Sequence, residues 1–159
     1  MEKQPNNKIK MHGELTKQQT ENILLSQSVC RIACIDDKFP YIVPLNYFYD
    51  GKYIYAQSHE GKKIKALRKN PNVCIQVDIV NSMNNWQSVI IYGEFEELKG
   101  EESEKARALL FDSIFTLMTN AKTHKFEHNQ DAAIDDSNRI KLIMFRIKLL
   151  ETMGRFEKQ

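Results

Sequence analysis

A short polar and basic stretch at residues 58–63 carries side chains that could bind a phosphate group. In chain order, these residues are Ser58, His59, Glu60, Gly61, Lys62 and Lys63. The stretch follows a β-type run and opens a helical one, and the N-terminus of a helix offers unpaired N–H groups and partial positive charge to an anion. Ser58 and His59 can donate hydrogen bonds, and Gly61 lets a ligand approach the backbone closely. The alternative interpretation is a capped helix whose lysines form a solvated basic face.

Other functional classes find less support in the sequence. The basic cluster is short and lacks the interleaved aromatic residues of a nucleic-acid stacking platform. The net charge of +2 is too small to indicate nucleic acid or a membrane surface as a partner. No apolar run approaches the ~20 residues that a membrane span needs. G-x-S-x-G, P-loop and G-x-G-x-x-G motifs do not occur, so hydrolase, NTPase and Rossmann functions lose their usual signals.

Two spacings could suggest a metal site, and we expect neither to bind one. His124, Glu127 and His128 fit the H-x-x-E-H spacing of zinc peptidases, but they fall in a polar segment with only a short strand after it. We therefore expect solvated histidines. Cys30 and Cys34 lie in a β-type run, which favours one shared face over a chelating turn, and no second pair exists.

The cysteines indicate a reducing compartment. Cys30, Cys34 and Cys74 are odd in number and have apolar neighbours, so we expect free, mostly buried thiols without a catalytic role. Residues 1–11 lack the apolar core of a secretory signal. The sequence thus predicts one cytoplasmic domain over residues 1–159, with residues 1–10 as a flexible tail.

The elements that must position these residues are mainly β. Helices are expected at residues 14–25, 61–69 and 101–118, and β-type runs at residues 29–35, 39–49, 52–57, 73–80, 86–98 and 139–151. Asp50-Gly51 predicts a type I′ hairpin turn, because that turn needs positive φ at both central residues. Pro44 indicates an edge or bulge and Gly93 a bend. This order predicts an α+β, mainly β fold: a six-stranded antiparallel barrel with flanking helices.

Taken in order, these segments resemble the pyridoxamine 5′-phosphate oxidase-like FMN-binding split β-barrels, especially the branch that includes nitroimidazole-resistance proteins. The resemblance runs from about Leu15 to Leu98, with a weaker echo at residues 151–154. It rests on residues 41–46, the Asp50-Gly51 hairpin, residues 58–63, residues 67–74, and residues 86–89 together with Gly93. The resemblance implies a homodimer with FMN at the subunit interface.

The resemblance also implies roles for individual residues. Those implied to bind the cofactor are Val43, Pro44, Leu45 and Asn46 along the flavin ring, Ser58, His59 and Gly61 in the polar turn, Lys62 and Lys63 at the phosphate, and Trp86 and Ser88 from the partner chain. In this fold the protein orients and tunes the flavin while the cofactor carries the electrons, and no catalytic acid or base can be assigned.

Two departures argue against oxidation of pyridoxamine 5′-phosphate itself. The flavin strand begins with Tyr41 and Ile42 where the oxidase has an arginine, and the C-terminus offers only Arg155 and Phe156 where the oxidase has a Trp and Arg pair. We therefore expect an FMN-dependent oxidoreductase acting on another small molecule, such as a nitro-aromatic compound. The alternatives are a non-catalytic flavin-binding module and a haem-handling split barrel, with His59, His124 and His128 as candidate ligands.

Overall fold

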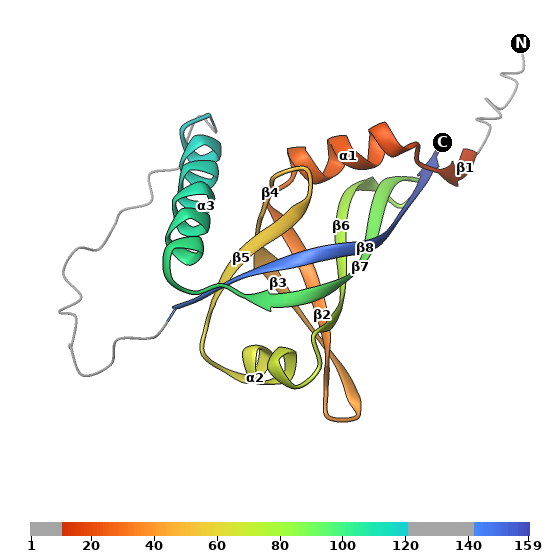
Figure 1. The fold of residues 1–159 in the computed structure, drawn as a ribbon. Coiled ribbons are helices and arrows are strands. Elements are labelled where there is room, and N and C mark those ends of the chain that lie inside the picture. Colours follow the sequence, from red (N-terminus) through yellow and green to blue (C-terminus); the bar gives the residue numbers. More distant parts are fainter. Residues whose placement is uncertain (1–10, 121–141) are drawn as a thin grey trace, which may run out of the picture.

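The computed structural model describes residues 11–120 and 142–159, which form one antiparallel sheet with flanking helices (Figure 1). The strands are β1 (Met11–Glu14), β2 (Val29–Asp36), β3 (Phe39–Asn46), β4 (Phe48–Tyr49), β5 (Tyr53–His59), β6 (Asn72–Ser82), β7 (Asn85–Glu97) and β8 (Leu142–Lys158). The helices are α1 (Lys17–Ser26), α2 (Lys62–Lys69) and α3 (Gly100–Asn120).

The sheet curls into a barrel that does not close. Its strand order is β3-β2-β6-β7-β8-β5-β4, and β1 pairs with the far end of β8. The long strand β8 holds the sheet together, because it pairs with β7 along much of its length and with β5 over its first half. The predicted split β-barrel is therefore confirmed. The structure has eight strands where six were expected, because β1 is additional and the 39–49 run divides into β3 and β4.

The helices begin close to their predicted positions. Thr16 caps α1 through its side chain, and Gln19 completes the predicted capping box. Figure 1 shows α1 and α2 at opposite ends of the curled sheet, with α3 beside β4 and β5. Asn70 ends α2 just before Pro71, as expected of a residue that precedes proline.

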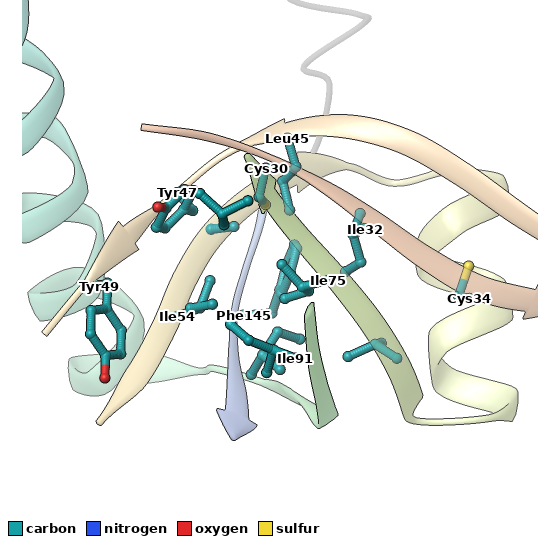
Figure 2. Close-up of a cluster of buried hydrophobic side chains, with 14 of the residues drawn as sticks. Cys30, Ile32, Cys34, Leu45, Tyr47, Tyr49, Ile54, Ile75, Ile91 and Phe145 are labelled. Atoms are coloured by element: carbon teal, nitrogen blue, oxygen red, sulfur yellow. The ribbon is translucent and has the colours of Figure 1, made fainter. Parts of the chain in front are cut away.

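The interior of the barrel is apolar, and Cys30 and Cys34 belong to it (Figure 2). Cys30 is fully buried and Cys34 is 3% exposed, while Cys74 is half-buried, and all three thiols are free. Burial raises the pKa of Cys30 to about 12, so very little thiolate exists at neutral pH. The expectation of free thiols is confirmed for all three cysteines, and the expectation of burial is confirmed for Cys30 and Cys34.

The turn at Asp50-Gly51 corrects one prediction. It does join two antiparallel strands, β4 and β5. Only Gly51 has positive φ, at 91°, so the turn is not type I′. The Asp50 carboxylate accepts hydrogen bonds from the backbone N–H groups of Lys52 and Tyr53, at 2.8 and 2.7 Å. Such a local side-chain bond stabilises a turn without the backbone of a type I′ hairpin.

Gly93 lies at the predicted irregularity in β7. The pairing of β7 with β8 shifts register between Tyr92 and Gly93, which leaves Leu150 as the extra residue of a bulge. A Cβ atom at Gly93 would lie 2.6 Å from Cγ2 of Ile147 and 2.7 Å from the carbonyl oxygen of Lys148. The close approach of β8 therefore requires glycine at this position.

Candidate functional site

A cleft of about 290 Å³ gathers most of the residues predicted to bind the cofactor. Its walls come from Pro44, Leu45 and Asn46 on β3, Gln57, Ser58 and His59 on β5, Lys63 on α2, and Leu142 on β8. These elements are separated in the chain, so the folding of the sheet and α2 creates the cleft. Larger hollows exist elsewhere, but they are lined by other parts of the chain.

Strand β3, which supplies one wall of the cleft, is an edge strand of the sheet. Pro44 pairs with Arg31 of β2 on one side, and β3 ends the strand order on the other, which is where a residue without an N–H donor is tolerated. Pro44 and Asn46 are both exposed while Leu45 between them is 7% exposed, so the predicted shared face of Pro44 and Asn46 is present. Val43 instead packs against the core, and its side chain does not line the cleft.

The turn between β5 and α2 supplies the opposite wall. Gly61 is the N-cap of α2, and its φ of 178° is an extended conformation open to any residue. A Cβ there would meet nothing closer than the carbonyl oxygen of His59, at 4.0 Å. Neither backbone strain nor internal packing requires this glycine, which fits the interpretation that it leaves space for a ligand. The first N–H groups of α2 lack partners within the helix, as at any helix start, and an anion can accept from them.

The two lysines of the turn occupy different environments. Lys63 is half-buried and lines the cleft, and burial lowers the pKa of its ammonium group. The Nζ of Lys62 lies 2.8 Å from Oδ2 of Asp36 and 5.0 Å from the centre of the Tyr41 ring. The hydrogen bond to Asp36 raises the pKa of Lys62. Lys63 is therefore the lysine that faces the cleft.

Trp86 and Ser88 lie on β7 and do not line this cleft. Following the register from Pro44 through β2 and β6 places Ser88 on the same face of the sheet. Three strand spacings separate β3 from β7, which is about 14 Å. Ser88 accepts a hydrogen bond from Nε2 of Gln76 at 3.2 Å. Within one protomer, neither residue reaches the cleft, so the implied role in cofactor binding requires a second copy.

The sequence prediction missed two residues of the cleft, Gln57 and Leu142. Gln57 immediately precedes the recognised turn, and its half-buried position at the end of β5 follows from the strand pattern. Leu142 enters because β8 pairs with β5, where it opposes His59. No local pattern encodes that long-range pairing, so only the fold could identify Leu142.

Of the three histidines considered as haem ligands, one lies in the described part of the chain. Over residues 11–120 and 142–159, no group of three or more His, Cys, Asp or Glu side chains could hold a metal ion. His59 lines the cleft, whereas His124 and His128 lie outside the described residues. In the same part of the chain, no helix is long and apolar enough to cross a membrane.

This architecture matches that of a known protein family. The model of the family described as pyridoxamine 5′-phosphate oxidase matches residues 16–142, which include both walls of the cleft. The chain belongs to the pyridoxamine 5′-phosphate oxidase family. That membership confirms the resemblance found in the sequence, and it accounts for an open antiparallel barrel with helices at its ends.

Two solved structures share the fold of this chain at modest sequence identity. A FAD-binding protein from Mesorhizobium loti is 28% identical, with a TM-score of 0.72 over 94% of this chain and 99% of the other. A candidate 5-nitroimidazole antibiotic resistance protein from Bacteroides thetaiotaomicron is 22% identical, with a TM-score of 0.67 over 94% of this chain and 90% of the other.

A curated relative matches a smaller part of this member of the pyridoxamine 5′-phosphate oxidase family. The uncharacterized protein RA0666 of Rhizobium meliloti strain 1021 is 33% identical over 84 residues, which is 53% of this chain. The match spans 56% of the length of that relative.

Proposed function

We propose that this chain is a flavin-binding oxidoreductase that holds FMN in the cleft between β3, β5 and α2. The observation that carries the proposal is that two chemically different walls face each other across one cleft. Pro44 and Asn46 form an exposed ledge on one side, and the turn that ends at Lys63 faces it with N–H groups and a positive charge. A flat ring system with one phosphate group matches this combination.

Each wall has a distinct task in this proposal. Lys63 and the first N–H groups of α2 bind the phosphate, with Ser58 and His59 as additional donors. Asn46 offers a donor and an acceptor to the polar edge of the ring. Pro44 lines the cleft with backbone that has no N–H group. Flavin, when bound, supplies the electron-transfer chemistry, while these side chains bind and orient it.

We further propose that two copies associate through the face of the sheet that carries Pro44. The same face bears partly exposed apolar side chains, namely Val29, Ile42, Tyr92 and Met153 at 50%, 59%, 47% and 37% exposure. Trp86 and Ser88 lie on it as well. A second copy on this face would cover the apolar side chains and could bring its Trp86 and Ser88 towards the flavin. Light scattering tests this part, and a flavin-loaded monomer at micromolar concentration would contradict it.

FAD is the second candidate, because the neighbour from Mesorhizobium loti, 28% identical, is a FAD-binding protein. The two cofactors share the ring and the first phosphate and differ in the adenosine portion beyond. Titration of the apo-protein with FMN, FAD and riboflavin separates them. We expect FMN to bind more tightly than riboflavin and at least as tightly as FAD. Clear preference for FAD would replace FMN in the proposal, and equal affinity for FMN and riboflavin would remove the phosphate site.

Turnover is a separate part of the proposal. We expect anaerobic reduction of a nitro-aromatic compound by the flavin-loaded protein in the presence of a chemical or nicotinamide electron donor. A protein that binds flavin and reduces no such acceptor would instead be a non-catalytic flavin-binding module. The free thiols of Cys30, Cys34 and Cys74 support a cytoplasmic location as part of the same proposal.

A further inference from the structure

Arg68 connects the polar turn to the end of the sheet through two bidentate ion pairs. Its Nη1 and Nη2 lie 2.6 and 3.1 Å from the two carboxylate oxygens of Glu60. Its Nε and Nη2 lie 2.7 and 2.9 Å from the carboxylate oxygens of Glu97. One guanidinium therefore holds one residue of the turn and one residue at the end of β7.

The Glu97 side of this connection is rigidly held. Glu97 is the last residue of β7 and pairs with Phe145 of β8. The next backbone N–H, that of Leu98, donates to the carbonyl oxygen of Met144 at 2.9 Å. Arg68 is itself anchored, because its neighbour Leu67 in α2 is fully buried. Arg68 therefore ties Glu60, in the turn, to an anchored part of the sheet.

We propose that Arg68 is a positioning residue for the phosphate-binding turn and that it acts through Glu60. This inference rests on the proposed function, since it assigns a task within the same site. Glu60 does not line the cleft, although His59 before it and Lys63 after it do. The ion pair turns the Glu60 carboxylate towards Arg68 and fixes the backbone on which Ser58, Gly61 and Lys63 are carried.

The charges around Arg68 distinguish a positioning role for Glu60 from a purely electrostatic one. Two carboxylates and one guanidinium leave a net charge of about −1 beside a turn that is proposed to bind an anion. If electrostatics alone mattered, removal of Glu60 would strengthen phosphate binding. If Glu60 instead holds the turn in its binding geometry, its removal weakens phosphate binding despite the lost negative charge. The two interpretations thus predict opposite signs.

The test compares the affinities of the apo-protein for FMN and for riboflavin, which differ by the phosphate group. We expect Glu60→Ala and Arg68→Ala each to weaken FMN binding by about tenfold or more, as for the loss of a charged hydrogen bond. Riboflavin affinity should stay nearly unchanged. The double variant should bind FMN no more weakly than Arg68→Ala, because the two residues act as a unit. Arg68→Lys should restore part of the loss.

Matched controls exist at the neighbouring position of β7, where Glu96 makes a similar bidentate pair with Arg146 of β8. Arg146→Ala and Glu96→Ala should lower stability without changing the ratio of FMN to riboflavin affinity. Tighter FMN binding by Glu60→Ala, or an unchanged ratio in Arg68→Ala, would overturn the inference alone. A wild-type protein that binds no flavin would overturn the proposed function and the inference with it. If Arg68→Ala does not fold, Glu60→Ala decides the question, because it leaves the Arg68–Glu97 pair in place.

Discussion

The ammonium group of Lys62 lies 2.8 Å from Oδ2 of Asp36, at the end of β2. This ion pair gives Lys62 a different environment from Lys63, although the two lysines look equivalent in the sequence. Lys62 is committed to Asp36 and to the ring of Tyr41, whereas Lys63 faces the cleft and is half-buried. Neighbouring lysines on a helix point in different directions, so one of them can tie the turn to the sheet while the other meets the ligand.

The two lysines should therefore differ in their effect on phosphate binding. We expect Lys63→Ala to weaken FMN binding by about tenfold or more, the value of one charge-assisted contact, with little change for riboflavin. Lys62→Ala should weaken it less, and the double variant should resemble Lys63→Ala. Fluorescence titration of each apo-variant measures these affinities. A loss of FMN affinity in Lys62→Ala as large as that in Lys63→Ala would refute the distinct roles of the two lysines.

Asn46 should influence the electronic state of the bound ring. Asn46→Ala removes a donor and an acceptor from the ledge that lines the cleft, so we expect a shifted flavin spectrum or reduction potential in the loaded protein. Asn22→Ala, an exposed asparagine on α1, serves as the control and should leave both unchanged. Identical spectra and potentials for the wild-type and Asn46→Ala proteins would place the ring elsewhere.

The cysteines should matter for stability and not for chemistry. Simultaneous replacement of Cys30, Cys34 and Cys74 by serine places hydroxyl groups in or near the core, and each poorly satisfied hydroxyl costs about 1–3 kcal/mol. Chemical denaturation should show this loss, while flavin content per folded molecule stays constant. Burial raises the pKa of each thiol, so thiolate chemistry is suppressed at neutral pH. Loss of turnover with fold and flavin intact would require a thiol-dependent mechanism.

Two glycines should respond to alanine in opposite ways. Gly93→Ala brings a Cβ within 2.6 Å of Ile147, and such overpacking costs about 1–3 kcal/mol or more of unfolding free energy. Gly61→Ala meets no close neighbour, so stability should hold while FMN affinity falls. Denaturation curves and flavin titrations on both variants make each the control for the other. A stable Gly93→Ala protein would mean that the bulge relaxes freely.

The Arg146–Glu96 pair should contribute to stability only above acidic pH. Hydrogen bonding from Arg146 lowers the pKa of Glu96 below its ordinary value of 4.5. The contribution is therefore fully present above about pH 4.5 and disappears as the pH falls through the lowered pKa of the folded state. Glu96 is half exposed, so we expect less than about 1 kcal/mol. Denaturation of Glu96→Gln and wild-type protein should converge at low pH, and a gap that widens on acidification would contradict this sign.

Local chemistry explains how much of the fold the sequence could predict. The Thr16–Gln19 capping box and the stop before Pro71 each depend on residues close in sequence. The irregularity at Gly93 was predicted from the glycine alone, whereas its cause is the close approach of Ile147 and Lys148 on β8. The predicted type I′ turn at Asp50-Gly51 was wrong, because only Gly51 has positive φ. The Asp50 side chain stabilises the turn instead. The last strand was predicted to stop at Glu151, yet β8 continues to Lys158 because it pairs with β1 and β7.

The candidate site shows the same division between local and long-range information. The turn at residues 58–63 and the ledge at Pro44 and Asn46 were recognisable from residue types, and the sheet brings them together in one cleft. The pairing of Lys62 with Asp36 and the entry of Leu142 depend on contacts between distant segments. Periodicity reports which face a residue occupies, but it cannot report which distant residue it meets.

The visible absorption spectrum of the purified protein tests the central claim most directly. The account predicts flavin bands, and a cofactor released on denaturation that co-migrates with FMN. A colourless protein whose addition leaves the fluorescence of FMN, FAD and riboflavin unchanged would contradict flavin binding. A Soret band in place of flavin bands would also contradict it and would assign the barrel to haem.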